Sequence, residues 1–125
     1  MARPVRVMVV EDTDHVRRML TSMLALDGFE IVAEAADGEQ AVEAVAAADP
    51  DVIVIDYKMP AMDGLAVARL VRETRPQQVV ILYTAYVDAA IEREAAAAGV
   101  SLCVDKMEGL ASLEREISRL SGTLD

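Results

Sequence analysis

Four short apolar runs in this chain each stop at a polar or ionisable residue. The runs and the residues that end them are 5–10 before Glu11 and Asp12, 51–55 before Asp56, 79–83 before Thr84, and 100–104 before Asp105 and Lys106. If the runs are parallel strands of one sheet, these ends lie at one edge, and an open α/β sheet builds its site outside the carboxyl ends of its strands. The pattern predicts a pocket that holds three carboxylates, a hydroxyl and an ammonium group.

The size of the chain predicts one folded unit. Its 125 residues match an ordinary domain, and an apolar content of 54% favours a packed globule. No apolar run approaches the roughly 20 residues that a membrane span needs, and the N-terminus has no long apolar stretch typical of a signal peptide. We expect a single cytoplasmic domain over 1–125 without membrane contact. Cys103 is the only cysteine, so no internal disulfide is expected.

The charge of the chain excludes one class of partner. Twenty-two acidic and twelve basic residues give a net charge of −10. Such a surface repels nucleic acid and anionic membranes, so direct nucleic-acid binding is not expected. A positively charged partner surface or a bound cation fits this balance better.

Strand-like and helix-like segments alternate along the chain, which is typical of βαβ units in a parallel sheet. A further strand is expected over 29–35, and five helices over about 14–26, 38–49, 64–74, 87–98 and 109–120. The first helix shows one apolar face at helical spacing, with Val16, Met19, Leu20, Met23 and Leu24. Right-handed crossovers favour a doubly wound, three-layer α/β sandwich, and the order 2-1-3-4-5 places the first and third strands together at the switch point.

The acidic cluster requires a positive charge. Glu11, Asp12 and Asp56 cannot all stay ionised side by side without compensation, because each raises the pKa of the others. Oxygen ligands without histidine or cysteine select a hard cation, and Mg²⁺ suits them best. Lys106 adds an ammonium group and Thr84 a hydroxyl, so the pocket can hold a transferring phosphoryl group. Asp56, at the end of a central strand, is the carboxylate expected to accept it.

Each of these residues has a simpler interpretation when it is taken alone. Glu11 and Asp12 before a helix are typical of a helix N-terminus, and Asp56 could begin a turn. Thr84 could be an ordinary strand residue and Lys106 a solvated charge. Their joint placement, each at the end of a different strand, favours a site. The neighbouring His15 is interpreted as a surface helix residue and not as a ligand.

Over residues 3–121 the chain resembles the receiver domain of bacterial two-component response regulators. The resemblance lies in Val7-Met8-Val9-Val10-Glu11-Asp12, in Asp56-Tyr57-Lys58-Met59-Pro60-Ala61-Met62-Asp63-Gly64, in Thr84-Ala85 and in Lys106. It implies a flavodoxin-like fold and a switch in which Asp56 takes a phosphoryl group from a histidine kinase or a phosphotransfer protein. It does not imply a turnover enzyme, although such domains slowly catalyse their own phosphorylation and dephosphorylation.

The resemblance also implies site roles. Asp12, Asp56 and the backbone carbonyl of Lys58 would hold Mg²⁺, with Mn²⁺ as a substitute, and Glu11 would reach the metal through water. Thr84 and Lys106 would contact the phosphoryl group and convert its arrival into movement of later loops. The last two helices and the last strand would serve output or homodimerisation. Candidate contacts there are Arg115, Glu116 and Arg119, although a solvated charged face is the simpler interpretation of each.

Three residues stand out beside this pattern. The family commonly has a switch aromatic three positions before the lysine, where this chain has Cys103. Tyr86, two residues after Thr84, could cover the pocket or take part in the relay, or it could be a loop aromatic packed on the surface. Lys58, two residues after Asp56, could tune how readily water reaches the acyl phosphate.

Three other functions are weighed against the sequence. A phosphohydrolase with an aspartyl phosphate intermediate needs a carboxylate two residues after its nucleophile, where this chain has Lys58. A nucleotide- or flavin-binding protein on a similar sheet would need glycines after the first strand, where the sequence is Glu11-Asp12-Thr13-Asp14. A receiver-like module that binds proteins without phosphorylation is the remaining alternative, and the presence of all the acceptor-site residues disfavours it.

Overall fold

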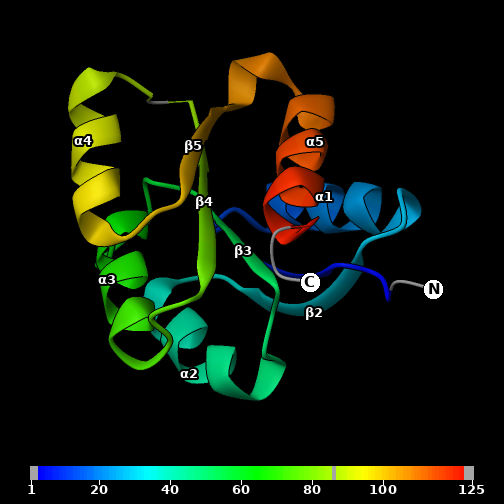
Figure 1. The fold of residues 1–125 in the computed structure, drawn as a ribbon, viewed down its shortest axis with the longest axis horizontal. Helices are drawn as coiled ribbons and strands as arrows, with labels where there is room; N and C mark the ends of the chain where they lie inside the picture. Colours follow the sequence, from blue (N-terminus) through cyan, green and yellow to red (C-terminus); the bar gives the residue numbers. More distant parts are fainter. Residues whose placement is uncertain (1–2, 86, 123–125) are drawn as a thin grey trace.

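The structure, a computed structural model, describes residues 3–85 and 87–122, so the predicted switch residue Tyr86 lies outside the described residues. Strands and helices alternate along the chain, as the sequence predicts (Figure 1). The elements are β1 (Arg6–Val10), α1 (Asp14–Leu26), β2 (Glu30–Ala35), α2 (Gly38–Ala48), β3 (Val52–Ile55), α3 (Gly64–Thr74), β4 (Val79–Thr84), α4 (Ala89–Ala98), β5 (Leu102–Asp105), the 3₁₀ helix η1 (Lys106–Glu108) and α5 (Leu110–Ser121).

The five strands form one parallel sheet in the order β2-β1-β3-β4-β5, which confirms the predicted topology. In the register, Val10 lies beside Ile55, and Thr84 lies beside Asp105. The residues that follow β1 and β3 therefore leave the sheet next to each other. β3 is buried at all four positions, which explains why its sequence is an unbroken aliphatic run instead of an alternating one.

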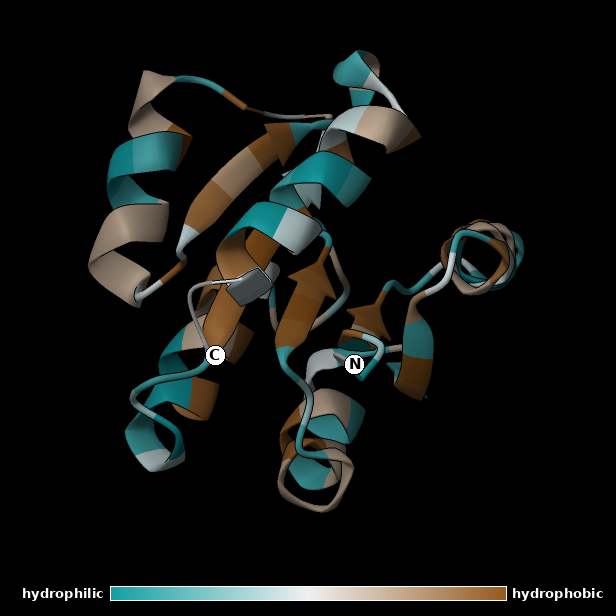
Figure 2. Ribbon diagram, turned by 45° about the vertical axis from the view of Figure 1, so that its right-hand side comes forward, coloured by the Kyte–Doolittle hydropathy of each residue, from teal (hydrophilic) through white to brown (hydrophobic). Residues whose placement is uncertain are grey.

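Helices cover both faces of the sheet and give the predicted three layers (Figure 1). On one face, α1 and α5 pack against β1, β3 and β4 through Leu20, Leu24, Leu113 and Ile117. On the other face, α2, α3 and α4 contribute Ala41, Val45, Leu65, Val67, Ala68, Val71, Ala95 and Ala98. Figure 2 shows the strands as the most hydrophobic part of the chain, with helices that alternate between polar and apolar faces. The core is thus two apolar layers separated by the sheet.

Most boundaries are close to those expected from sequence. α1 and α3 have the predicted limits, and α4 begins two residues late because the Asp88 side chain caps it by accepting from the Ile91 N–H. The short helix η1 was not predicted; it begins where Asp105 accepts from the Met107 N–H. Among the described helices, none combines the length and the apolar content that crossing a bilayer requires.

The predicted inner face of α1 is partly wrong. Leu20 and Leu24 are buried, but Met19 and Met23 are 59% and 43% exposed. They lie along the edge of the apolar stripe, beside a groove between α1 and α5 that the two helices do not close. The 3.6-residue period identifies which side of a helix is apolar, but it does not show how much of that side its neighbours cover.

A pair of acidic side chains joins the ends of α1 and α5. The Glu114 carboxyl lies against Asp27, the residue that caps the C-terminus of α1. Glu114 Oε2 is shielded from solvent, and no donor within the described residues reaches it. Burial and the Asp27 carboxyl raise the pKa of Glu114 to about 7.

This pair predicts a loss of stability as the pH rises. The pKa of Glu114 is higher in the folded protein than the ordinary 4.5, so the folded state binds more protons between about pH 4.5 and 7. The free energy of unfolding should fall as the pH rises through that window. Urea unfolding at pH 5 and pH 7.5 should show a smaller fall for Glu114→Gln than for the native chain. Exposed Glu43→Gln on α2 is the control, and an equal fall in all three proteins would contradict the raised pKa of Glu114.

Candidate functional site

The carboxyl ends of β1 and β3 bring three acidic side chains together. Glu11, Asp12 and Asp56 each offer a carboxylate oxygen, and these oxygens all lie within 4.8 Å of one another. The Asp56 N–H donates to the Val10 carbonyl at 3.1 Å, which joins the two strand ends by a backbone hydrogen bond. The convergence predicted from sequence is therefore present.

Glu11 is the most buried member of the cluster, at 4% exposed. Its Oε2 accepts from the Thr13 N–H at 3.2 Å, and its backbone N–H donates to the Ala35 carbonyl. Burial, a hydrogen bond with Asp12 and the charge of Asp56 raise its pKa, although the Thr13 N–H and Lys106 oppose the shift. Thr13 is the N-cap residue of α1 and makes no side-chain cap, and the Glu11 carboxylate that belongs to the cluster accepts from its N–H.

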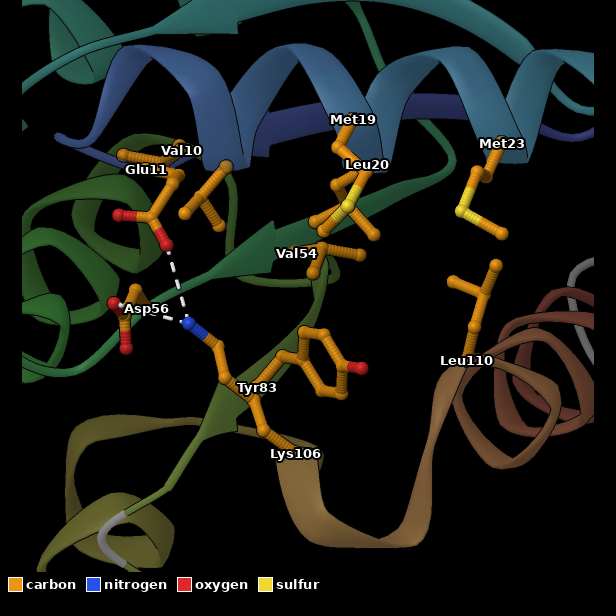
Figure 3. A pocket seen from close by; sticks show the side chains of 11 residues that line it. Val10, Glu11, Met19, Leu20, Met23, Val54, Asp56, Tyr83, Lys106 and Leu110 are labelled. Atoms are coloured by element: carbon orange, nitrogen blue, oxygen red, sulfur yellow. Dashed lines mark hydrogen bonds and ion pairs between the residues drawn. The ribbon is translucent and has the colours of Figure 1, made fainter.

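Lys106 supplies the positive charge that the cluster requires. It is the first residue of η1, and its Nζ lies 3.1 Å from Glu11 Oε1 and 3.4 Å from Asp56 Oδ2 (Figure 3). Burial acts to lower its pKa, but the charges of Asp56 and Glu11 and its hydrogen bonds with them outweigh this effect, so the pKa is raised. Lys106 therefore stays protonated at neutral pH and holds the two carboxylates together.

Asp56 keeps part of its side chain accessible. The side chain is 14% exposed; Oδ1 accepts from the Tyr57 N–H at 2.8 Å, and Oδ2 faces Lys106. The loop after Asp56 returns at Gly64, whose N–H donates to the Tyr57 carbonyl at 2.8 Å. A methyl group at position 64 would collide with the Asp56 carbonyl oxygen. The glycine thus lets α3 begin directly beneath the acidic residue.

The remaining residues singled out in the sequence differ in how far they are buried. Thr84 ends β4 and is fully buried, and its register partner on β5 is Asp105, the residue before Lys106. Lys58 and His15 are exposed. Cys103 is half-buried beside Leu82 and packs on the α2–α3–α4 side of the sheet, where burial and the nearby Glu92 raise the pKa of its thiol.

The donor set fits a hard divalent cation. It contains carboxylate oxygens within the reach of one ion, and Mg²⁺ takes one or two such carboxylates together with water. Burial is the main cause of the raised pKa of Glu11, and the charge of Asp56 adds to it. A second positive charge beside these carboxylates would offset that charge.

Sequence reasoning missed the groove that opens from this cluster. A cavity of about 320 Å³ runs from Asp56 and Lys106 along the space between α1 and α5 (Figure 3). Its apolar part is lined by Val10, Val16, Met19, Leu20, Met23, Val54, Tyr83 and Leu110. One signal in the sequence could have indicated this groove. Side chains alternate along a strand, so Tyr83 must face the α1–α5 side of the sheet if Thr84 faces the α2–α3–α4 side.

A family model described as the response regulator receiver domain matches residues 7–118, nearly the whole described chain. The chain belongs to the receiver domain family. A crystal structure of a two-component response regulator of the LuxR family from Aurantimonas sp. SI85-9A1 superposes with a TM-score of 0.92 at 27% identity, covering 96% of this chain and 86% of that one. The receiver fold and the resemblance seen in the sequence are thus confirmed.

Curated relatives are longer than this receiver. The transcriptional regulatory protein PdtaR of Mycobacterium tuberculosis is 33% identical over 141 residues, covering 99% of this chain and 68% of that protein. A protein-glutamate methylesterase/protein-glutamine glutaminase of Geobacter metallireducens is 46% identical over 79 residues, which is 62% of this chain and 23% of that protein. The match to the methylesterase therefore covers less than a quarter of that relative.

The close approach at Gly64 yields a stability prediction. Gly64→Ala should lower the free energy of unfolding by about 1–3 kcal/mol, because the added methyl group must displace the loop that follows Asp56. Gly122→Ala is the matched control, since nothing lies within 4 Å of a methyl group there and its φ of −62° is helical. Urea unfolding measures both. Equal free energies of unfolding for the two variants would show that the loop after Asp56 accommodates the methyl group without loss of stability.

Proposed function

We propose that this receiver accepts a phosphoryl group on Asp56 from a histidine kinase or a phosphotransfer protein, and that the resulting acyl phosphate switches its contacts with a partner or an output domain. The observation that carries the proposal is the placement of Lys106 Nζ between Glu11 and Asp56, at the mouth of a partly open acidic cluster. A lysine held there neutralises an arriving phosphoryl group.

The transfer is a substitution at phosphorus. A carboxylate oxygen of Asp56 forms the new P–O bond while the bond from phosphorus to the donor's imidazole nitrogen breaks, and the electron pair of that bond stays with the nitrogen. The Tyr57 N–H fixes one oxygen of the carboxylate, so its plane is set before the donor arrives. Lys106 and the Thr84 hydroxyl are the proposed partners of the phosphoryl oxygens. Positioning and charge neutralisation are the main contributions that a protein makes to such a step.

Mg²⁺ is the proposed cofactor, and Mn²⁺ a substitute. Asp12, Asp56 and the backbone carbonyl of Lys58 are the proposed ligands, with Glu11 acting through water. A bound divalent ion would offset negative charge on the carboxylates and on the phosphoryl oxygens. The close set of carboxylate oxygens supports this assignment.

The proposed activity is that of a switch and not of a turnover enzyme. A phosphohydrolase would need a general acid two residues after Asp56, and that position carries the exposed Lys58. The exposure of the Lys58 side chain also supports its proposed role in setting how readily water reaches the acyl phosphate.

Output and homodimerisation through α4, β5 and α5 stay predictions; within that surface Arg119 pairs with Glu116 at 2.6 Å. A receiver-like module that binds proteins without phosphorylation is the alternative.

Phosphorylation of Asp56 is tested directly. Incubation with Mg²⁺ and acetyl phosphate should add one phosphoryl group to the native chain, as seen by intact-protein mass spectrometry. Asp56→Asn should abolish the adduct, because an amide does not replace the carboxylate nucleophile. Asp51→Asn, at the opposite end of β3, is the control and should still be phosphorylated. Absence of the adduct from the native chain would favour the protein-binding alternative, and continuous phosphate release at enzymatic rates would favour a hydrolase.

Metal binding is tested by thermal unfolding with and without Mg²⁺. At roughly 100 times its Kd, a ligand that binds the folded state stabilises it by about 3 kcal/mol, so Tm of the native chain should rise. Asp12→Asn should be more stable than the native chain without metal, because one repulsive charge is removed, and should gain less from Mg²⁺.

Asp14→Asn is the control for this test, because Asp14 is exposed at the start of α1 and pairs with Arg17. It should respond to Mg²⁺ like the native chain. An undiminished response of Asp12→Asn would remove Asp12 from the ligand set.

A further inference from the structure

Tyr83 places an aromatic ring beside the acidic cluster on the α1–α5 side of the sheet. Its ring centroid lies 5.8 Å from Lys106 Nζ, within the range of a cation–π contact. The ring packs with the apolar cluster under α1 and α5, and it lines the wall of the groove (Figure 3). Lys106 therefore contacts both the phosphoacceptor cluster and an aromatic side chain.

The usual aromatic position of the family lies on the other side of the sheet. Cys103 packs with the α2–α3–α4 side, and its half-buried thiol has no ring that could swing. The other aromatic residues within 3–85 and 87–122 are Phe29 and Tyr57. Phe29 packs in the α1–α5 cluster at the opposite end of β1, and Tyr57 packs on the α2–α3–α4 side. Among the described aromatic residues, Tyr83 shares the cavity with Lys106.

One cavity connects the charged cluster, the Tyr83 ring and the groove. Asp56, Lys106, Tyr83, Met19, Met23 and Leu110 all line the same space of about 320 Å³. Figure 3 shows the Met23 side chain on α1 facing Leu110 across the groove, while Met19 and Tyr83 lie nearer the charged end formed by Asp56 and Lys106. Methionine side chains repack easily, so this wall can follow a movement of the ring.

Phosphorylation changes what Lys106 is attracted to. In this structure its Nζ binds the carboxylates of Glu11 and Asp56. When one oxygen of Asp56 becomes esterified, the negative charge moves outward onto the phosphoryl oxygens, and the ammonium group follows that charge. The Tyr83 ring then no longer has the Lys106 ammonium group over its face. Because that face is apolar, its removal from water favours deeper packing of the ring between α1 and α5.

We infer that Tyr83 is the aromatic relay of this receiver: it transmits the phosphorylation state of Asp56 through Lys106 to the groove between α1 and α5, which narrows on phosphorylation. The inference rests on the proposed function of Asp56. It assigns the α1–α5 groove as a surface whose shape depends on the state of the switch, in addition to the output surface that the family resemblance implies.

Oxidation of Met19 and Met23 by dilute hydrogen peroxide tests the relay. Peptide mass spectrometry gives the rate for each methionine, and intact mass gives the phosphorylated fraction in the same samples. With Mg²⁺ and excess acetyl phosphate, both residues of the native chain should be oxidised about twofold more slowly, or slower still, than in the same chain without acetyl phosphate. The reason is that a narrowed groove shields the sulfur atoms. Met107, which is 87% exposed in η1, supplies the reference rate.

Two substitutions at the same position separate the ring from the hydroxyl. Tyr83→Phe keeps the aromatic face and should retain the slowing. Tyr83→Leu should become phosphorylated to the same extent but lose the slowing, because it lacks the ring. Asp56→Asn should show no slowing under the same conditions. Circular dichroism melts confirm that the variants are folded.

Each contrary result identifies which idea fails. A phosphorylated native chain with unchanged methionine rates would overturn the relay and leave the proposed function standing. Equal slowing in the native chain and Tyr83→Leu would also overturn it, because the groove would respond without the ring. If the native chain gains no phosphoryl group, the proposed function and the relay both fail.

Discussion

The site depends on one compensated charge cluster. Lys106 is separated from Glu11 by 95 residues and from Asp56 by 50, yet its ammonium group binds both carboxylates. Without that contact, the side chains at the ends of β1 and β3 would repel one another in a poorly solvated pocket. The same contact ties η1, and therefore the start of α5, to the centre of the sheet. Loss of the lysine would affect chemistry and packing together.

The order of the strands in the sheet brings the members of this cluster together. β1 and β3 are neighbours although α1, β2 and α2 lie between them in sequence, so two acidic strand ends meet at the topological switch point. β4 and β5 then bring Thr84 and Asp105 into register, so Lys106, the next residue, lies at the same edge. The rest of the fold consists of buried aliphatic strands, whose rigidity fixes where these four ends lie.

Sequence periodicity predicted the sheet, its order and the acidic cluster, because these follow from the places where apolar runs stop. It did not predict how completely neighbours cover a helix face. Met19 and Met23 match the apolar stripe of α1 as well as Leu20 does, but the spacing of α1 and α5 leaves the two methionines at an open groove. It likewise identified Thr84 as the polar residue that ends an apolar run and overlooked Tyr83, whose significance appears only once Lys106 is seen beside its ring.

The end of β4 presents two adjacent side chains to two different compartments. Thr84 and Tyr83 point to opposite faces because side chains alternate along a strand. A single inserted or deleted residue within β4 would exchange them, placing a bulky phenol where the small hydroxyl belongs and a hydroxyl against the methionines. Natural variation in the length of this strand should therefore be far more restricted than variation in the identity of its aliphatic residues.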